Sequence, residues 1–200
     1  MKARSLVWLM LLGATSVQAA DGETPDRTRW WFEAGAGFAT VGGDRESSGR
    51  GSQDGISFDF AGGMRVGDHW LVGLDIGSII TDSYDLYFGS QGRSLSHLFL
   101  MADYNARADG GWLFHVGAGF TDFTDSELTT AAAREGHGPA FEAGIGYAWR
   151  PSRSNYIVLR GIYEFGRIEA NNGVAAESES FNYSAPRLSV SWQFRTGNPR

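Results

Sequence analysis

Apolar side chains alternate with polar or small ones along eight stretches of this chain. The stretches cover residues 30–41, 56–66, 70–81, 96–107, 112–123, 139–149, 156–167 and 183–194. Because successive side chains of a β-strand point to opposite faces, a period of two predicts strands with one apolar face each. Each stretch is close to the about 9–11 residues that a tilted strand needs to cross a bilayer. The pattern therefore predicts eight strands that cross a membrane.

The segments between these stretches alternate between long and short. The long ones are residues 42–55, 82–95, 124–138 and 168–182, and the short ones are residues 67–69, 108–111 and 150–155. Barrels of the bacterial outer membrane have short periplasmic turns and long outer loops. We therefore expect an all-β fold, an eight-stranded antiparallel up-and-down transmembrane β-barrel, with both termini in the periplasm and four long loops outside.

The first 19 residues have the three parts of a secretory signal peptide. Lys2 and Arg4 form the basic start, residues 6–12 form the apolar stretch, and Val17 and Ala19 are the small residues that precede a cleavage site. An apolar stretch of this length is too short to cross a bilayer as a helix. We expect a cleaved signal peptide over 1–19, a periplasmic segment over 20–28, the barrel over 29–194 and a periplasmic tail over 195–200.

The charge balance and composition fit an exported barrel. Without Lys2 and Arg4 of the signal peptide, the net charge of −6 becomes −8, with 15 Arg, no Lys and 23 acidic residues. An acidic protein does not attract a phosphate backbone, so we expect no nucleic-acid partner. The chain has no Cys, which excludes disulfides and thiol chemistry. Its 28 glycines suit strands that bend around a barrel.

One face of every predicted strand is apolar and free of charge. On this register, five tryptophans fall on that face near the expected periplasmic ends: Trp30, Trp70, Trp112, Trp149 and Trp192. Aromatic girdles lie at membrane interfaces, where an apolar ring with a polar edge is best placed. We expect this row to mark the periplasmic interface. A soluble β-sandwich is the alternative for the same alternation, but it gives no reason for tryptophans to gather at one end.

The opposite face of the strands collects the charges. The inward residues are Glu33, Asp59, Arg65, Asp75, Asp103, His115, Glu142, Arg160, Glu164 and Arg187. The interior of an eight-stranded barrel is just wide enough for side chains to fill, and buried charges are tolerated when they are paired. We expect an Arg–carboxylate network that plugs the lumen, with Arg65, Arg160 and Arg187 as hubs, because the planar guanidinium can serve two carboxylates. The surplus of acids leaves a narrow cation-preferring channel for small solutes as an alternative.

The last predicted strand resembles the assembly signal that the outer-membrane insertion machinery reads. Its polar, small and aromatic positions are Arg187, Ser189, Trp192 and Phe194, with Ser189 in place of the usual Gly. With the strand count and the loop rhythm, residues 28–194 resemble the small outer-membrane barrels typified by outer-membrane proteins A and X. The resemblance implies outer-membrane lipid, lipopolysaccharide and the insertion machinery as partners. It also implies a range of roles, from adhesion and membrane integrity to solute passage and lipid A modification.

The expected outer loops are the candidate contacts for host or surface ligands. They are polar, acidic and rich in Gly, and residues 82–95 add the aromatic side chains Tyr84, Tyr87 and Phe88. Binding residues concentrate on loops that a rigid scaffold holds in place. The sequence therefore favours a structural, adhesive or surface-interaction barrel over the channel.

The histidines decide whether an enzyme is possible. The chain contains His69, His97, His115 and His137. On this register none of them lies beside a nucleophile on the lipid-facing side, as a lipid A-modifying enzyme would require. Only His97 or His137 with Asp82 or Asp125, near the outer rim, could form part of a hydrolytic site. No spacing typical of metal ligands is present. We expect no enzymatic activity, no catalytic residue, no cofactor and no bound metal.

Overall fold

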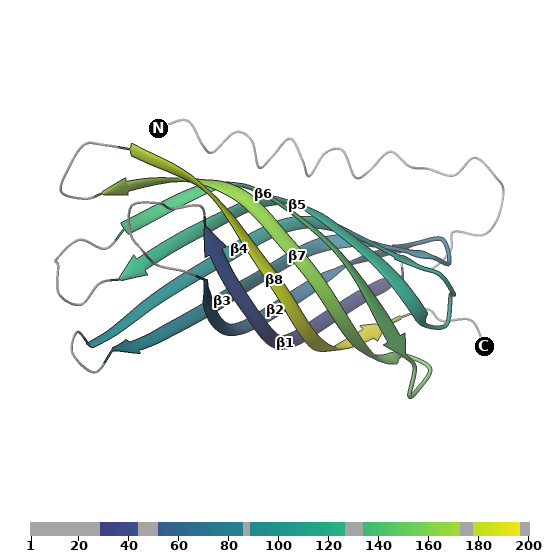
Figure 1. Cartoon of the computed structure of the whole chain (residues 1–200). Helices are drawn as coiled ribbons and strands as arrows, with labels where there is room; N and C mark the ends of the chain where they lie inside the picture. Colours follow the sequence, from purple (N-terminus) through teal and green to yellow (C-terminus); the bar gives the residue numbers. More distant parts are fainter. Residues whose placement is uncertain (1–28, 44–51, 86–88, 127–133, 173–177, 197–200) are drawn as a thin grey trace.

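The computed structural model describes residues 29–43, 52–85, 89–126, 134–172 and 178–196, and these form one closed β-barrel (Figure 1). Its strands are β1 (Trp30–Gly43), β2 (Gln53–Val66), β3 (Trp70–Asp85), β4 (Gly89–Asn105), β5 (Gly111–Ser126), β6 (Arg134–Trp149), β7 (Asn155–Asn172) and β8 (Ser178–Arg195). Each strand pairs antiparallel with its sequence neighbours, and β8 pairs with β1 to close the barrel. The expected fold class is confirmed. Among the described residues, no helix is long and apolar enough to cross a membrane.

The two ends of the barrel differ in how the strands are joined. β1 begins and β8 ends at the end that also holds the short connections at residues 67–69, 106–110 and 150–154, and we call it the turn end. There the backbone N–H of Thr196 donates to the carbonyl of Trp30, which ties the end of β8 to the start of β1. At the opposite end, the loop end, the connecting residues lie outside the described part of the chain.

A continuous apolar band surrounds the barrel. The five tryptophans predicted on this face lie toward the turn end with exposed fractions between 45% and 56%, whereas the neighbouring Trp31, Leu71 and Leu113 are fully buried. Tyr104 and Tyr147 join the same row, 5.0 Å from Trp70 and 5.5 Å from Trp112 between ring centroids. An apolar surface of this extent is unsuited to water and matches the lipid-facing band of an outer-membrane barrel. The predicted division between outward and inward positions is therefore correct.

The strands are longer than the alternation predicts. They span 14 to 18 residues, and β3 and β4 run through much of the segment 82–95 that we expected to be a loop. Strand residues also occupy parts of the other three expected loops, 42–55, 124–138 and 168–182. The reason is an inversion of polarity toward the loop end. There Asp122 and Glu169 are exposed on the outside, while Ile79, Leu95 and Ile168 are buried inside. The alternation used for the prediction requires an apolar outer face. It therefore stops where the apolar residues move to the inner face, although the strands continue.

The interior consists of three layers along the barrel axis. The layer toward the loop end is an apolar cluster of Ala39, Val41, Ile79, Leu95, Phe99, Phe123, Ala140, Ile168, Ala170, Tyr183 and Ala185. The middle layer holds the buried carboxylates and histidines with Arg160 and Arg187, whereas Arg65 and Arg195 are buried toward the turn end. Toward the turn end, two further clusters contain Leu113, Ala148, Tyr156 and Val158, and Trp31, Leu71 and Met101. Apolar side chains thus flank the charged layer on both sides.

Glycines make the space that the inward charged side chains occupy. Gly117 is the register partner of Glu142, and Gly77 is the partner of both Asp59 and His97. A Cβ atom on Gly117 would lie 2.8 Å from Cγ of Glu142, and one on Gly77 would lie 2.7 Å from Oδ1 of Asp59. Both distances are too short for carbon. Each of these side chains therefore lies across a neighbouring strand at a residue that has no side chain of its own.

This packing predicts different outcomes for two glycine substitutions. Gly117→Ala should lower the free energy of unfolding by about 1–3 kcal/mol, because the added methyl group displaces Glu142 in a filled interior. The control is Gly161→Ala on the lipid-facing side of β7, where the nearest atom to a new Cβ is the carbonyl oxygen of Ile145 at 4.0 Å. It should change stability by less than about 0.5 kcal/mol. Urea unfolding of the detergent-refolded protein measures both, and equal losses would contradict the packing argument.

Candidate functional site

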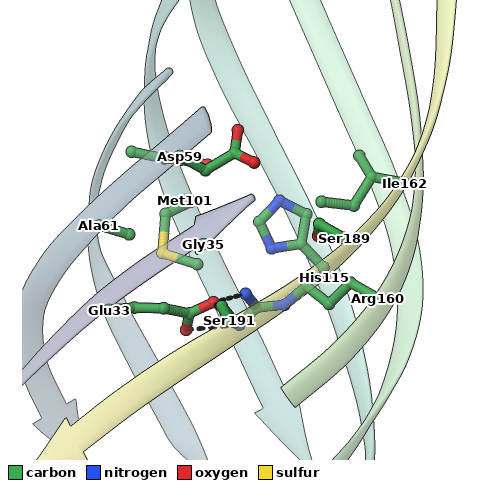
Figure 2. Close-up of a pocket in the computed structure, with 11 residues that line it drawn as sticks. Glu33, Gly35, Asp59, Ala61, Met101, His115, Arg160, Ile162, Ser189 and Ser191 are labelled. Carbon is green, nitrogen blue, oxygen red and sulfur yellow. Dashed lines mark hydrogen bonds and ion pairs between the residues drawn. The ribbon is translucent and has the colours of Figure 1, made fainter. Parts of the chain in front are cut away.

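Arg160 on β7 is the first hub of the buried charge network. It is 6% exposed, and its guanidinium pairs with both carboxylate oxygens of Glu33 on β1. Its Nη2 also donates to Oδ2 of Asp103 on β4 at 2.6 Å. Figure 2 shows Arg160 and Glu33 reaching toward each other across the lumen. Glu33 also accepts hydrogen bonds from Ser191 at 2.5 Å and from Gln193 at 2.6 Å. One cation thus joins three strands that are not neighbours in the sheet.

Arg187 on β8 is the second hub. Its Nη1 pairs with Asp59 on β2, and its Nη2 lies 2.5 Å from Oε2 of Glu142 on β6. Glu164 on β7 lies 3.9 Å from the same nitrogen. Glu164 accepts a hydrogen bond from the hydroxyl of Tyr183 at 2.7 Å, which connects the charged layer to the apolar layer at the loop end.

Two buried histidines complete the network. Nδ1 of His115 lies 2.7 Å from Asp103, and Nε2 lies 2.9 Å from Glu142, so this ring joins the Arg160 hub to the Arg187 hub. His97 stacks on Phe99 and lies 3.4 Å from Glu164 through Nδ1. The predicted network omits His97, although its inward position follows from the same alternation. Two-residue periodicity was thus a sufficient signal for it.

Asp75 on β3 differs from the other carboxylates of the network. It is 4% exposed, and its Oδ1 has no hydrogen-bond partner among the described residues. With His115 and Glu33 it lines a cavity of about 10 Å³, whose other lining residues include Asp59, Met101 and Arg160 (Figure 2). A cavity of this size holds about one water-sized particle. Every other acid named for the network has at least one charged partner.

Acids outnumber bases in this layer. The carboxylates are Glu33, Asp59, Asp75, Asp103, Glu142 and Glu164, and the bases are Arg160, Arg187, His97 and His115. Even with both imidazoles protonated, two negative charges remain. A buried charge requires a partner, so this surplus calls for bound protons or a bound cation.

The expectation that Arg65 is a hub of this network is wrong. On β2 it lies four residues beyond Ala61, the register partner of Glu33, toward the turn end. Its Nη2 donates to the carbonyls of Asp68 at 2.8 Å and Ala108 at 3.3 Å, in the turns after β2 and β4. The alternation fixes the face on which a side chain lies, but a hub must also lie at the height of its partners.

Arg195 is a buried cation that sequence reasoning missed. We expected it to begin a tail, but β8 includes it and its side chain is buried. Its guanidinium lies 4.0 Å from the ring centroid of Tyr156, a cation–π contact, and Nη2 donates to Oδ1 of Asn105 at 3.0 Å. The inward alternation of Arg187, Ser189, Ser191 and Gln193 continues to Arg195, and this was the available signal.

The remaining predicted residues fall on the faces expected for them. In the last strand, Arg187 and Ser189 face inward and Trp192 faces outward, with Phe194 half-buried. His69 lies in the turn after β2, and its Nδ1 is 2.8 Å from the carbonyl oxygen of Asn105. A carbonyl oxygen can only accept, so Nδ1 of His69 is the donor and carries a proton.

Of the possible hydrolytic pairs, the structure describes the histidines but not the aspartate side chains. His137 is exposed on β6 and not in a loop, because β6 extends beyond the apolar band. His97 faces the lumen and contacts Glu164 and Asp59. The side chains of Asp82 and Asp125, like the aromatic residues Tyr84, Tyr87 and Phe88, lie outside the described part.

The comparisons with known proteins agree with the architecture. The family model described as the outer membrane protein beta-barrel domain matches residues 7–194. Neisserial surface protein A (NspA) is 17% identical with a TM-score of 0.53, over 82% of this chain and 96% of that one. Ail of Yersinia pestis, in complex with the heparin analogue sucrose octasulfate, is 12% identical with a TM-score of 0.51, over 84% and 99%.

A major outer membrane protein from Thermus thermophilus is also similar. It is 15% identical with a TM-score of 0.51, over 84% of this chain and 99% of that one. At these identities the likeness to the solved structures shows a shared fold. No curated protein matches the chain.

The network predicts a large effect for its first hub. Arg160→Ala should lower the free energy of unfolding by about 3–5 kcal/mol, because Glu33 and Asp103 stay buried without their cation. The control Arg167→Ala removes an exposed guanidinium that donates to Ser180 at 2.7 Å, and it should cost less than about 1 kcal/mol. Urea unfolding in detergent measures both. Equal losses would show that the buried pairing contributes no more than a surface contact.

Proposed function

Because the chain belongs to the outer membrane protein β-barrel domain family, we propose that it is a plugged outer-membrane barrel that acts through its surface. Its role is structural, adhesive or surface-binding, and its partners are outer-membrane lipid, lipopolysaccharide and ligands that meet the loop end. In this proposal residues 1–19 are removed on export, the turn end and both termini face the periplasm, and the insertion machinery reads the last strand. The proposal includes no catalysis and no nucleic-acid partner.

The filled lumen is the observation that carries this proposal. A conducting pore needs a continuous path of water, whereas here an apolar cluster fills the loop-end side of the charged layer, and apolar clusters with the buried Asn105, Gln193 and Arg195 fill the turn-end side. Within the charged layer, the cavity beside Asp75 measures only about 10 Å³. An eight-stranded barrel is expected to have its interior filled by side chains. These features favour a rigid scaffold for the loop end over a channel.

The charge on the loop end bears on the kind of ligand. On the described outer faces near this end, the acidic residues Asp54, Asp122, Glu135 and Glu169 are exposed, together with the cation Arg167. Residues 168–182 contain three acidic residues and no Lys or Arg. Like charges repel, and a ligand must find complementary potential on the surface that it approaches. The heparin analogue bound by Ail is a polyanion. We therefore propose that the loop end of this chain does not take sulfated polyanions and favours neutral or basic partners.

The plugged lumen predicts electrical silence. Refolded protein in a planar bilayer should show no steady conductance, and Arg160→Ala should also show none, because the apolar layers remain in place. Before each recording, a mobility difference between boiled and unboiled samples on a gel confirms that the barrel is folded. A cation-selective conductance that grows in Arg160→Ala would overturn the plugged-lumen proposal in favour of the narrow channel.

The acidic loop end predicts a reversal of ligand preference on charge change. Asp122 and Glu169 are exposed on either side of His137, which is the register partner of both. Sucrose octasulfate should produce no heat of binding with the refolded protein in calorimetry at low ionic strength. The double variant Asp122→Lys/Glu169→Lys should gain detectable binding, because it replaces two negative charges with two positive ones beside His137. Binding to the wild type with an affinity equal to that of the variant would contradict the proposed preference.

A further inference from the structure

The carboxylate of Asp75 is one of three donor groups that converge in the middle of the lumen. Asp75, His115 and Glu142 each offer a ligand atom, and these atoms all lie within 4.8 Å of one another. All three residues are buried. Oδ1 of Asp75 has no hydrogen-bond partner among the described residues. A buried carboxylate oxygen without a hydrogen-bond partner is unfavourable. Here it lies beside an imidazole and a second carboxylate, and a cation bound by the three groups would pair with it.

From this convergence we propose that the lumen binds one divalent transition-metal ion through Asp75, His115 and Glu142. In the present arrangement a proton lies between Nε2 of His115 and Oε1 of Glu142, which are 2.9 Å apart. The metal ion takes the place of that proton, which is released to solvent, and Oδ1 of Asp75 supplies the third ligand. One imidazole and two carboxylates form a nitrogen–oxygen donor set that suits Zn²⁺ and similar ions. The adjoining cavity of about 10 Å³ has room for a water as fourth ligand.

The outer partners of these ligands already hold them in place. Nδ1 of His115 lies 2.7 Å from Oδ1 of Asp103, so the ring can donate there while Nε2 faces the metal. Metal-binding histidines usually donate their second N–H to a carboxylate or carbonyl in this way. Oε2 of Glu142 accepts a hydrogen bond from Arg187 at 2.5 Å, which leaves Oε1 for the metal. The network therefore contains both the ligands and the groups that orient them.

The charge balance supports the same site. Six carboxylates against two arginines and two protonated histidines leave two negative charges, and a divalent ion that replaces the proton on Nε2 of His115 lowers this surplus to one. A bound ion is often the largest local charge in a protein site.

A second triad shares Asp75 but is less suited to a metal. Asp59, Asp75 and His97 also bring donor atoms within 4.8 Å of one another. However, Nη1 of Arg187 pairs with Oδ1 of Asp59 and lies 3.4 Å from Nε2 of His97. Two of these three donors thus already face a guanidinium cation. The triad with His115 is the one that we assign.

The apolar layers at both ends restrict access, so we expect the ion to enter during folding and to exchange slowly. Metal binding often couples to folding in this way. The full chain is therefore refolded in detergent with Zn²⁺, passed over a gel-filtration column with a chelator, and analysed for zinc by atomic emission. We expect close to one zinc per folded chain. Mg²⁺ should not be retained, because it prefers an octahedral oxygen shell that keeps several waters.

Four variants locate the ion. Asp75→Asn and Glu142→Gln should lose nearly all bound zinc, whereas Asp59→Asn should keep it. Glu33→Gln is the matched control and should also keep it, because it removes a buried carboxylate that pairs with Arg160 and is not one of the three proposed ligands. A parallel urea titration should show that zinc raises the stability of the wild type and of Asp59→Asn but not that of Glu142→Gln.

Each result of these assays either supports or overturns the site. Folded wild type that retains no zinc overturns the proposal. Loss of zinc from Asp59→Asn with retention in Glu142→Gln overturns the assignment of the ligands. If Asp75→Asn fails to fold, the contrast between Asp59→Asn and Glu142→Gln still decides. The electrical silence of the barrel is tested separately, so failure of this site leaves the proposed function standing.

Discussion

The pairing of Arg160 with Glu33 and Asp103 connects parts of the barrel that the backbone ladder cannot connect. Backbone hydrogen bonds join each strand to its two neighbours, whereas this guanidinium on β7 contacts carboxylates on β1 and β4. Arg187 makes the equivalent connection between β8, β2 and β6. Because unpaired buried charges are strongly unfavourable, the set is stable only when the strands that carry the paired residues are in register. The charge pairs thus fix which strands face one another across the lumen, which the backbone hydrogen bonds of the sheet alone do not fix.

Space and charge are arranged together in the lumen. The side chains that carry the network are long, and the barrel is narrow, so neighbouring strands present glycine opposite them, as Gly117 does to Glu142 and Gly77 to His97. The apolar clusters on either side then separate the charges from water. Low access to water strengthens each ion pair and makes any unpaired member more unfavourable. Oδ1 of Asp75 is therefore unfavourable, because this carboxylate, unlike the other five of the layer, has no ion pair among the described residues to compensate for its burial.

The sequence was sufficient to predict which way each side chain points. Alternation with a period of two placed Trp30 and Trp192 outside and Glu33 and Arg160 inside, and the closed eight-stranded topology followed from the spacing of the segments. The sequence was not sufficient to predict how far along the barrel axis each side chain lies. Arg65 faces inward like the hubs but lies too near the turn end, and Arg195 was left out because the apolar outer face ends at Phe194. The strand ends toward the loop end were also missed. The apolar residues there lie inside the barrel, so the apolar outer face that the prediction relied on ends before the strands do.

Toward the loop end the apolar residues move from the outer face of the strands to the inner face, and this change determines how deep the barrel lies in a bilayer. Sliding outward-facing Asp122 into hydrocarbon is unfavourable, and sliding Phe120 out of it is unfavourable too, so the boundary between them fixes the depth. From Phe165, at the edge of the apolar band, β7 continues to Asn172, which is about 23 Å along a strand at roughly 3.3 Å per residue. With the usual tilt of about 40°, the paired backbone rises about 18 Å beyond the lipid boundary. A molecule that approaches the loop end therefore meets a hydrogen-bonded rim well clear of the headgroups before it meets the membrane.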